Sequence, residues 1–490
     1  MSNDRAERLG DMLSRLSEAD RTSLQRCAER LLAALPKPHL PDNVVLVAFG
    51  GGKDSSYSVF FVRAMQLWLW RQHGATFALR VVTNRQAGMP AAVMANIDRV
   101  YQALGLHDDP DCQLLLVDAD DIRGFTADAP HSAAMLDRNR LDVLLTGHRT
   151  AADARPTFCN ACNLSMVNAF GLAAGHDGGV DVIITGDSRQ EQRAYAVWVN
   201  RLARRFGGAR RGGGGTGFGG FLTSLDAVSQ VYFAEIHGPG PAVEERRITS
   251  AVPPALLFFS IYDETEYASG SHWQLLTEFL GFRFDELAFS FTESDCANPA
   301  LMAHLRGLKA ERMFGRDYAE GLAEYAEFAV GLMRRKEFPD LLVDMMTERY
   351  HGDGAAARLR RRINEFAWES YRLREEQLVC MVYAPFAGCG AGLDRFVTRE
   401  HPAFAGRLAR LHEVLAGTGD GTAADRDFLT EVSGLPLDRL RLLYHGPAPA
   451  AGDTGGSILA AVLDGDPHKA VITTRHASAG PQLTELISGR

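Results

Sequence analysis

The chain has few cysteines and no long apolar run. Seven cysteines in 490 residues is an odd and modest number, which argues against a disulfide framework and leaves metal binding or catalysis as the use of any clustered pair. The longest apolar runs, such as residues 255–261, are far shorter than a bilayer span. The first eight residues lack the apolar core of a signal peptide. We therefore expect a cytoplasmic protein with no membrane association.

The chain also has fewer basic than acidic residues. The formal net charge of −9 disfavours a nucleic-acid-binding surface over the whole chain, although a local one stays compatible with it. A small-molecule or peptide substrate is therefore favoured. A chain of this length with 46% hydrophobic residues is expected to form two or three domains with large cores.

Three segments of the chain differ in pattern. Residues 1–40 carry leucines at helical spacing and end in three prolines, which predicts an N-terminal helical element. In residues 41–300 short apolar runs alternate with helical stretches, which predicts an α/β domain with a parallel sheet. Residues 301–490 are predicted to be mainly helical and to serve substrate recognition or dimerisation, and we expect a homo-oligomer. The runs predicted as strands are residues 44–48, 77–83, 114–117, 180–185 and 256–261.

Polar residues follow several of these predicted strands. They are Thr83 with Asn84, Asp118, and Gly186 with Asp187. Ligands of open α/β sheets bind beyond the carboxyl ends of the strands. We therefore expect one crevice to gather these residues and the segment that follows the first strand.

The segment after the first predicted strand is rich in glycine. The apolar run 44–48 leads through Phe49 into Gly50, Gly51 and Gly52, and a polar helix start follows. Glycine lets a backbone turn sharply and approach a ligand closely, and a helix N-terminus offers N–H groups to an anion. This design suits a phosphate, although the spacing fits neither a Walker loop nor a dinucleotide fingerprint. The alternative is a strand-to-helix turn with no ligand, in which a polar residue after the glycines caps the helix.

The sequence also contains a pair of nearby cysteines, Cys159 and Cys162, and a third cysteine, Cys296, far along the chain. A Cys-x-x-Cys pair in a cytosolic protein serves as half of a zinc site, half of an iron–sulfur site or a redox pair, and the spacing does not choose between them. The alternative is a set of buried apolar cysteines. The other four cysteines are isolated in the sequence and are expected to be dispensable.

The glycine segment resembles the Ser-Gly-Gly-x-Asp-Ser loop of the PP-loop ATP pyrophosphatase superfamily. Gly51, Gly52, Asp54 and Ser55 match that pattern, and Gly50 stands where the family has its first serine. The resemblance implies a Rossmann-like fold of the adenine nucleotide alpha hydrolase type. It also implies ATP-dependent adenylation of a substrate oxygen, with AMP and pyrophosphate as products.

The same resemblance assigns roles to single residues. Asp54 is expected to hold Mg²⁺ and Lys53 to reach a phosphate. Gly186 and Asp187 resemble the family's second signature, which includes an acidic pair completed here by Glu191; an ordinary helix N-cap at Asp187 is the alternative. The residues expected to bind the nucleotide are Phe49, Gly50, Gly51, Gly52, Lys53, Asp54, Ser55, Ser56, Thr83 and Gly186, and those expected to be catalytic are Asp54, Lys53 and Asp187.

The order of the cysteines resembles the branch of the superfamily that contains 2-thiocytidine-type tRNA thiolases. In that branch a Cys-x-x-Cys and one distant cysteine hold a 4Fe–4S cluster, which implies that Cys159, Cys162 and Cys296 are metal ligands and that sulfur is inserted, with tRNA a possible substrate. The N-acetyl sugar amidotransferases are similar as well, and they imply nitrogen insertion with Zn²⁺ at the cysteines. A nucleotide-binding protein without turnover is the third hypothesis. The resemblance covers about residues 43–300.

Overall fold

The computed structural model describes most of the chain. The described residues are 2–152, 156–184, 189–207, 217–248, 256–262, 272–287, 296–335, 340–352, 354–449, 456–465 and 469–488. Within these ranges, no helix has both the length and the apolar character needed to cross a membrane.

The chain forms two compact units, each built from three stretches of sequence. One unit contains residues 1–131, 164–228 and 248–285, and the other contains residues 132–163, 229–247 and 286–490. The divisions at residues 163 and 228 fall within the helices α6 (Pro156–Gly175) and α8 (Gly217–His237). The predicted domain boundaries after residues 40 and 300 stay predictions.

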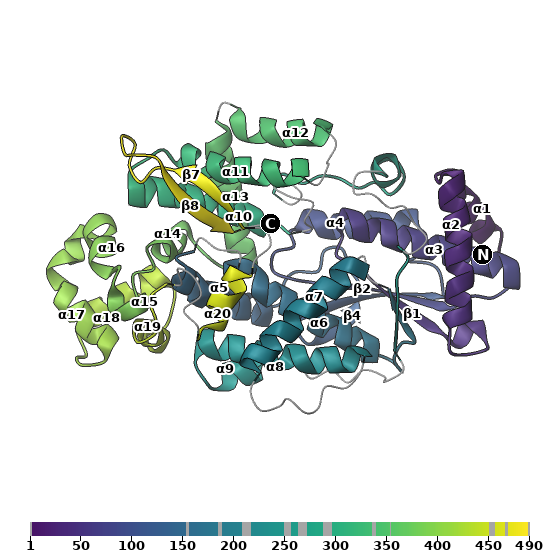
Figure 1. The fold of residues 1–490 in the computed structure, drawn as a ribbon, viewed down its shortest axis with the longest axis horizontal. Helices are drawn as coiled ribbons and strands as arrows, with labels where there is room; N and C mark the ends of the chain where they lie inside the picture. Colours follow the sequence, from purple (N-terminus) through teal and green to yellow (C-terminus); the bar gives the residue numbers. More distant parts are fainter. Residues whose placement is uncertain are drawn as a thin grey trace. The chain divides into compact units, whose positions relative to one another are not determined.

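The first unit contains a six-stranded sheet (Figure 1). Every neighbouring pair of strands is parallel except the antiparallel pair β3–β4 at one edge. The predicted α/β class with a mainly parallel sheet is therefore confirmed. The strand order is β4-β3-β2-β1-β5-β6, and the strands are β1 (Val44–Ala48), β2 (Ala78–Asn84), β3 (Cys112–Asp118), β4 (Asp121–Gly124), β5 (Val182–Ile184) and β6 (Leu257–Phe259).

Helices cover both faces of this sheet. Leu46 and Val82 form a core cluster with Ala169 and Ala173 of α6, whereas the next residue of β2, Thr83, contacts a helix on the other face. Successive residues of a strand point to opposite faces, so these helices lie on opposite sides. The other helices of this unit are α1 (Ser2–Ser14), α2 (Glu18–Ala34), η1 (Leu40–Asp42), α3 (Lys53–His73), α4 (Ala91–Ala103), α7 (Arg189–Phe206) and the π-helix η2 (Leu275–Phe279).

The second unit is mainly helical, as predicted for residues 301–490. The elements of this unit other than its parts of α6 and α8 are α5 (Ala133–Thr150), α9 (Pro241–Glu244), α10 (Asn298–Leu308), η3 (Lys309–Met313), α11 (Tyr318–Arg335), α12 (Asp340–His351), α13 (Ala355–Tyr371), α14 (Glu375–Tyr383), α15 (Ala387–Gly390), α16 (Leu393–Glu400), η4 (Pro402–Arg407), α17 (Leu408–Ala416), α18 (Ala423–Ser433), α19 (Leu437–Tyr444), α20 (Ile458–Asp464) and the hairpin β7 (Lys469–Thr474) with β8 (Leu483–Ser488). Buried Arg306 of α10 donates to Glu324 of α11 and Glu485 of β8. These ion pairs fix the hairpin to the helices.

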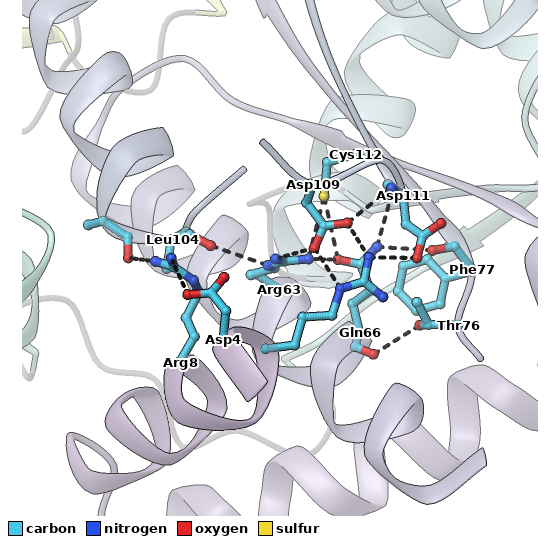
Figure 2. A network of polar contacts seen from close by, with 12 residues as sticks. Asp4, Arg8, Arg63, Gln66, Thr76, Phe77, Leu104, Asp109, Asp111 and Cys112 are labelled. Atoms are coloured by element: carbon cyan, nitrogen blue, oxygen red, sulfur yellow. Dashed lines mark hydrogen bonds and ion pairs between the residues drawn. The ribbon is translucent and has the colours of Figure 1, made fainter. Parts of the chain in front are cut away.

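A buried arginine stabilises the amino-terminal edge of the sheet. Arg63 of α3 is 1% exposed, and its Nη2 lies 2.7 Å from Oδ2 of Asp109. Both oxygens of this carboxylate also accept from Arg5 of α1. Figure 2 shows the network: Gln66 and Cys112 accept hydrogen bonds from the same Arg63 guanidinium that binds this carboxylate. Burial alone would raise the pKa of Asp109, but Arg63, the Asp111 N–H and Arg5 together outweigh it and hold that pKa below its usual value. The network therefore fixes α1 and α3 to the start of β3.

The substitution Asp109→Asn should destabilise the fold strongly. Removing one partner of a buried ion pair costs about 3–5 kcal/mol, because the other charge stays buried without compensation. Urea unfolding at pH 7 measures the loss. The lowered pKa of Asp109 adds a pH signature: the wild-type advantage is complete above the usual carboxyl pKa of about 4 and is lost as the pH falls through the folded-state value.

The control is Asp4→Asn, because Asp4 forms its ion pair with Arg8 on the surface, with its side chain 68% exposed. That change should cost less than about 1 kcal/mol. Equal losses in the two variants would contradict a dominant role for the buried pair.

Candidate nucleotide site at the carboxyl edge of the sheet

The glycine segment lies at the point where the strand order reverses. The chain passes from β1 outward to β2 and β3, and it later returns to place β5 on the other side of β1. In open α/β sheets, ligands bind at this switch point, outside the carboxyl ends of the strands. The residues that follow β1 therefore occupy the position where this kind of fold binds ligands.

Gly51 fixes the turn from β1 into α3. Its φ of +79° is in the left-handed region, and a Cβ added there would lie 2.8 Å from Cγ1 of both Val93 and Ile97 in α4. A side chain at this position would be strained and would also displace α4. The turn therefore requires glycine here for two independent reasons.

Phe49 and Thr83 hold the loop from the core side. The Thr83 hydroxyl donates to the Phe49 carbonyl at 2.9 Å, and the Phe49 ring packs on Tyr101 of α4 at a centroid distance of 5.6 Å. Both side chains are buried. The structure thus places these two predicted site residues where they position the loop backbone.

The helix α3 begins without a side-chain cap. Gly52 is its N-cap residue and supplies no side-chain hydrogen bond, so Asp54 and Ser55 stand in the first turn and not at the capping position. The hydroxyls of Ser55 and Ser56 donate to the Gly52 carbonyl at 3.1 Å and 2.8 Å. Ser56 is fully buried and serves the fold, whereas half-buried Ser55 lies at the loop surface.

A charged pair stands at this helix start. Lys53 is 3% exposed, and its Nζ lies 3.1 Å from Oδ1 of Asp54, whose side chain is 37% exposed. A buried ammonium beside helix N–H groups favours an anion at the loop. A carboxylate that reaches solvent there is a suitable ligand for Mg²⁺ on that anion.

The sequence predicted that Asn84 lies in the crevice but gave it no specific role, and it gave none to Arg85. The amide Nδ2 and Oδ1 of Asn84 are buried with no hydrogen-bond partner among the described residues. The next residue, Arg85, is 5% exposed and donates to the carbonyls of Met89 and Ala129. Burial lowers the pKa of Arg85 to about 10, against the opposing effect of Asp118. Polar residues directly after a strand were the available signal, but hydrogen-bond satisfaction is not readable from sequence.

Several predicted site residues lie outside the described residues. They are Gly186 and Asp187, together with the side chain of Glu191. Cys159 and Cys162 are three residues apart in α6, and their side chains also lie outside the described part. Their roles stay predictions.

Cys296 lies just before α10 in the second unit. Its Sγ accepts a hydrogen bond from the backbone N–H of Asn298 at 3.4 Å, as sulfur ligands of metal centres often do. The Asn298 side chain accepts from the Tyr371 hydroxyl at 2.6 Å, and the Tyr371 ring packs on Phe158 at 5.8 Å. Phe158 directly precedes Cys159, so the Cys296 turn and the start of α6 meet at one tyrosine.

The described residues contain no group of three or more His, Cys, Asp or Glu side chains arranged to hold a metal. The predicted cysteine set includes two side chains outside those residues.

Comparison with protein-family models and with curated proteins finds no match for this chain. The geometry of the site therefore carries the functional argument.

The substitution Gly51→Ala should destabilise the fold. The left-handed backbone alone costs a residue with a Cβ about 1–2 kcal/mol, and the contacts with α4 add to that cost. Chemical unfolding measures the difference. Gly10→Ala is the control, because Gly10 lies within α1 and a Cβ there meets no atom within 4 Å. That change should stabilise the protein by up to about 1 kcal/mol, and a similar gain at position 51 would contradict the constrained turn.

Proposed function

We propose that this protein is an ATP-dependent adenylating enzyme of the PP-loop type. The observation that carries the proposal is the glycine loop between β1 and α3, with left-handed Gly51 at the switch point of the sheet. The uncapped start of α3 and the buried ammonium of Lys53 support it. Together they suit the polyphosphate of a nucleotide.

In the proposed reaction the loop amides and Lys53 hold the phosphates of ATP. Mg²⁺, held with the help of Asp54, would offset the charge of the leaving pyrophosphate. A substrate oxygen attacks the α-phosphorus, and the bond from that phosphorus to the β-phosphate oxygen breaks. A nucleophile then attacks the activated carbon, and the C–O bond breaks as AMP leaves. Asp187 would help Asp54 to hold the Mg²⁺ ion.

Sulfur is the proposed nucleophile. The position of Cys296, hydrogen-bonded at its sulfur and joined through Tyr371 to the start of α6, supports a metal site with Cys159 and Cys162. An iron–sulfur cluster held there would bind the sulfide that thiolation requires. Ammonia with a structural zinc is the alternative, since zinc tolerates the same ligands. A small molecule or peptide is the favoured substrate, with tRNA as the alternative.

Substrate-dependent turnover should release AMP and pyrophosphate. Because attack falls on the α-phosphorus, ADP should not accumulate, and ³¹P spectra of the products measure this directly. Asp54→Asn should abolish turnover without unfolding the protein, because the change is nearly isosteric and the Asp54 side chain is 37% exposed, so that water compensates part of the lost charge beside Lys53.

The control is Asp42→Asn, since Asp42 is an exposed carboxylate beside His39 and its loss should leave turnover unchanged. Stoichiometric ADP, or full activity in Asp54→Asn, would contradict the proposal.

Changing Cys296 to Ser should remove most of the metal from anaerobically purified protein, because ligands of one centre act as a unit. Iron, zinc and acid-labile sulfide contents measure the effect. Cys389→Ser is the control, since Cys389 is an exposed free cysteine and should be dispensable. Full metal retention in Cys296→Ser would remove this cysteine from the centre.

Turnover with isotope-labelled sulfide, ammonium or glutamine, together with the metal content, distinguishes the thiolating enzyme from the amidotransferase. Iron with labile sulfide, and product labelled from sulfide, is the outcome that thiolation requires. Zinc alone with product labelled from ammonium or glutamine would make the amidotransferase correct. If the protein binds ATP but forms no product with either the sulfur or the nitrogen donor, the hypothesis of a nucleotide-binding protein without turnover is the one supported.

A further inference from the structure

We infer that two side-chain amides, those of Asn84 and Asn168, bind the base of the nucleotide and select adenine by its 6-amino group. The inference rests on the proposed function and adds to it the residues that determine base specificity.

Asn84 lies beside the glycine loop. In the β1–β2 register Ala48 pairs with Val82, and the pairing continues beyond the strand, because the Phe49 N–H donates to the Val82 carbonyl at 2.8 Å. Two residues further along β2, Asn84 is level with Gly50. A base attached to phosphates in the loop therefore has the end of β2 within its reach.

Asn84 and Asn168 belong to the same face of the sheet. Asn84 pairs in register with Val117 of β3, and Val117 belongs to the core cluster that includes Ala169 of α6. Asn168 directly precedes Ala169. It lies at the carboxyl edge, because its Nδ2 donates to Oδ1 of Asp120, two residues after the end of β3.

Three polar atoms of these amides have no partner. They are Nδ2 and Oδ1 of Asn84 and Oδ1 of Asn168, all buried and without a hydrogen bond within the described part of the chain. Buried polar groups are nearly always hydrogen-bonded, and an exception calls for an explanation such as a ligand. The two amides offer one NH2 donor group and two acceptor oxygens.

This set of partners selects an amino group. The Asn84 amide alone would bind adenine and hypoxanthine equally well, because a half-turn of the side chain exchanges the positions of its donor and its acceptor. Asn168 has no such freedom, since its Nδ2 donates to the Asp120 carboxylate and a half-turn would place its oxygen against that carboxylate. Its oxygen is therefore fixed as an acceptor. Adenine supplies two N–H donors from one amino group and an adjacent ring-nitrogen acceptor, whereas hypoxanthine has a carbonyl in place of the amino group.

The test is the affinity of the full chain for ATP, ITP and inorganic tripolyphosphate, measured by calorimetry. Wild-type protein should bind ATP at least about 10-fold more tightly than ITP, as expected for a site with hydrogen-bonding groups left unpaired by the wrong ligand. Asn84→Leu should reduce the ATP/ITP ratio to within about 3-fold, and Asn168→Leu should do the same. Affinity for tripolyphosphate should not change in either variant, which also shows that both variants fold.

Two controls sharpen this test. Gln86→Leu, at a half-buried position two residues further on, should keep the wild-type ratio. The melting temperature of nucleotide-free Asn84→Leu should not fall, because the replaced amide has no partner to lose. A clear fall would assign Asn84 to the fold and overturn the inference.

The outcomes for the two proposals are distinct. Wild-type protein that binds neither ATP nor tripolyphosphate would overturn the proposed function and this inference with it. If wild-type protein binds ATP and ITP with equal affinity, or if Asn84→Leu keeps the wild-type ATP/ITP affinity ratio, the inference is overturned and the proposed function is not.

Discussion

The geometry of the site depends on one constrained turn. The backbone leaves β1 and enters α3 through Gly51, which has a left-handed conformation and where an added Cβ would lie 2.8 Å from Val93 and Ile97 of α4. This turn directs the start of α3 at the switch point of the sheet and brings Lys53 and Asp54 to the same place. The close approach of α4 leaves no room for a side chain, so the position of the helix start is determined by packing.

The two edges of the sheet differ in how their polar groups are satisfied. At the amino-terminal edge, Arg5 and Arg63 share the carboxylate of Asp109, and burial raises the pKa of nearby Cys112 to about 12, which keeps it a neutral thiol. At the carboxyl edge the amides of Asn84 and Asn168 keep unpaired atoms among the described residues. A protein loses stability by burying such atoms, so their position at the carboxyl edge of the sheet is consistent with a ligand that completes them.

Part of this arrangement was predictable from the sequence. The apolar run at residues 44–48 and the glycines after it gave β1 (Val44–Ala48) and the loop, because a strand and a glycine turn are local features. The strand β4 (Asp121–Gly124) was missed, since a short polar edge strand has no apolar signal and forms by pairing with β3. The strand order and the unsatisfied amide of Asn84 arise from tertiary neighbours, which no spacing in the sequence reveals. The contact between the Cys296 turn and Phe158 through Tyr371 is of the same kind.

The central claim is that a nucleotide binds at the glycine loop, and hydrogen–deuterium exchange with and without Mg²⁺ and ATP tests it most directly. Nucleotide binding at the loop should slow exchange in peptides that cover residues 49–56 and 83–86, with little change at the amino-terminal edge around Asp109. Unchanged exchange at the loop, or protection confined to the second unit, would contradict the account.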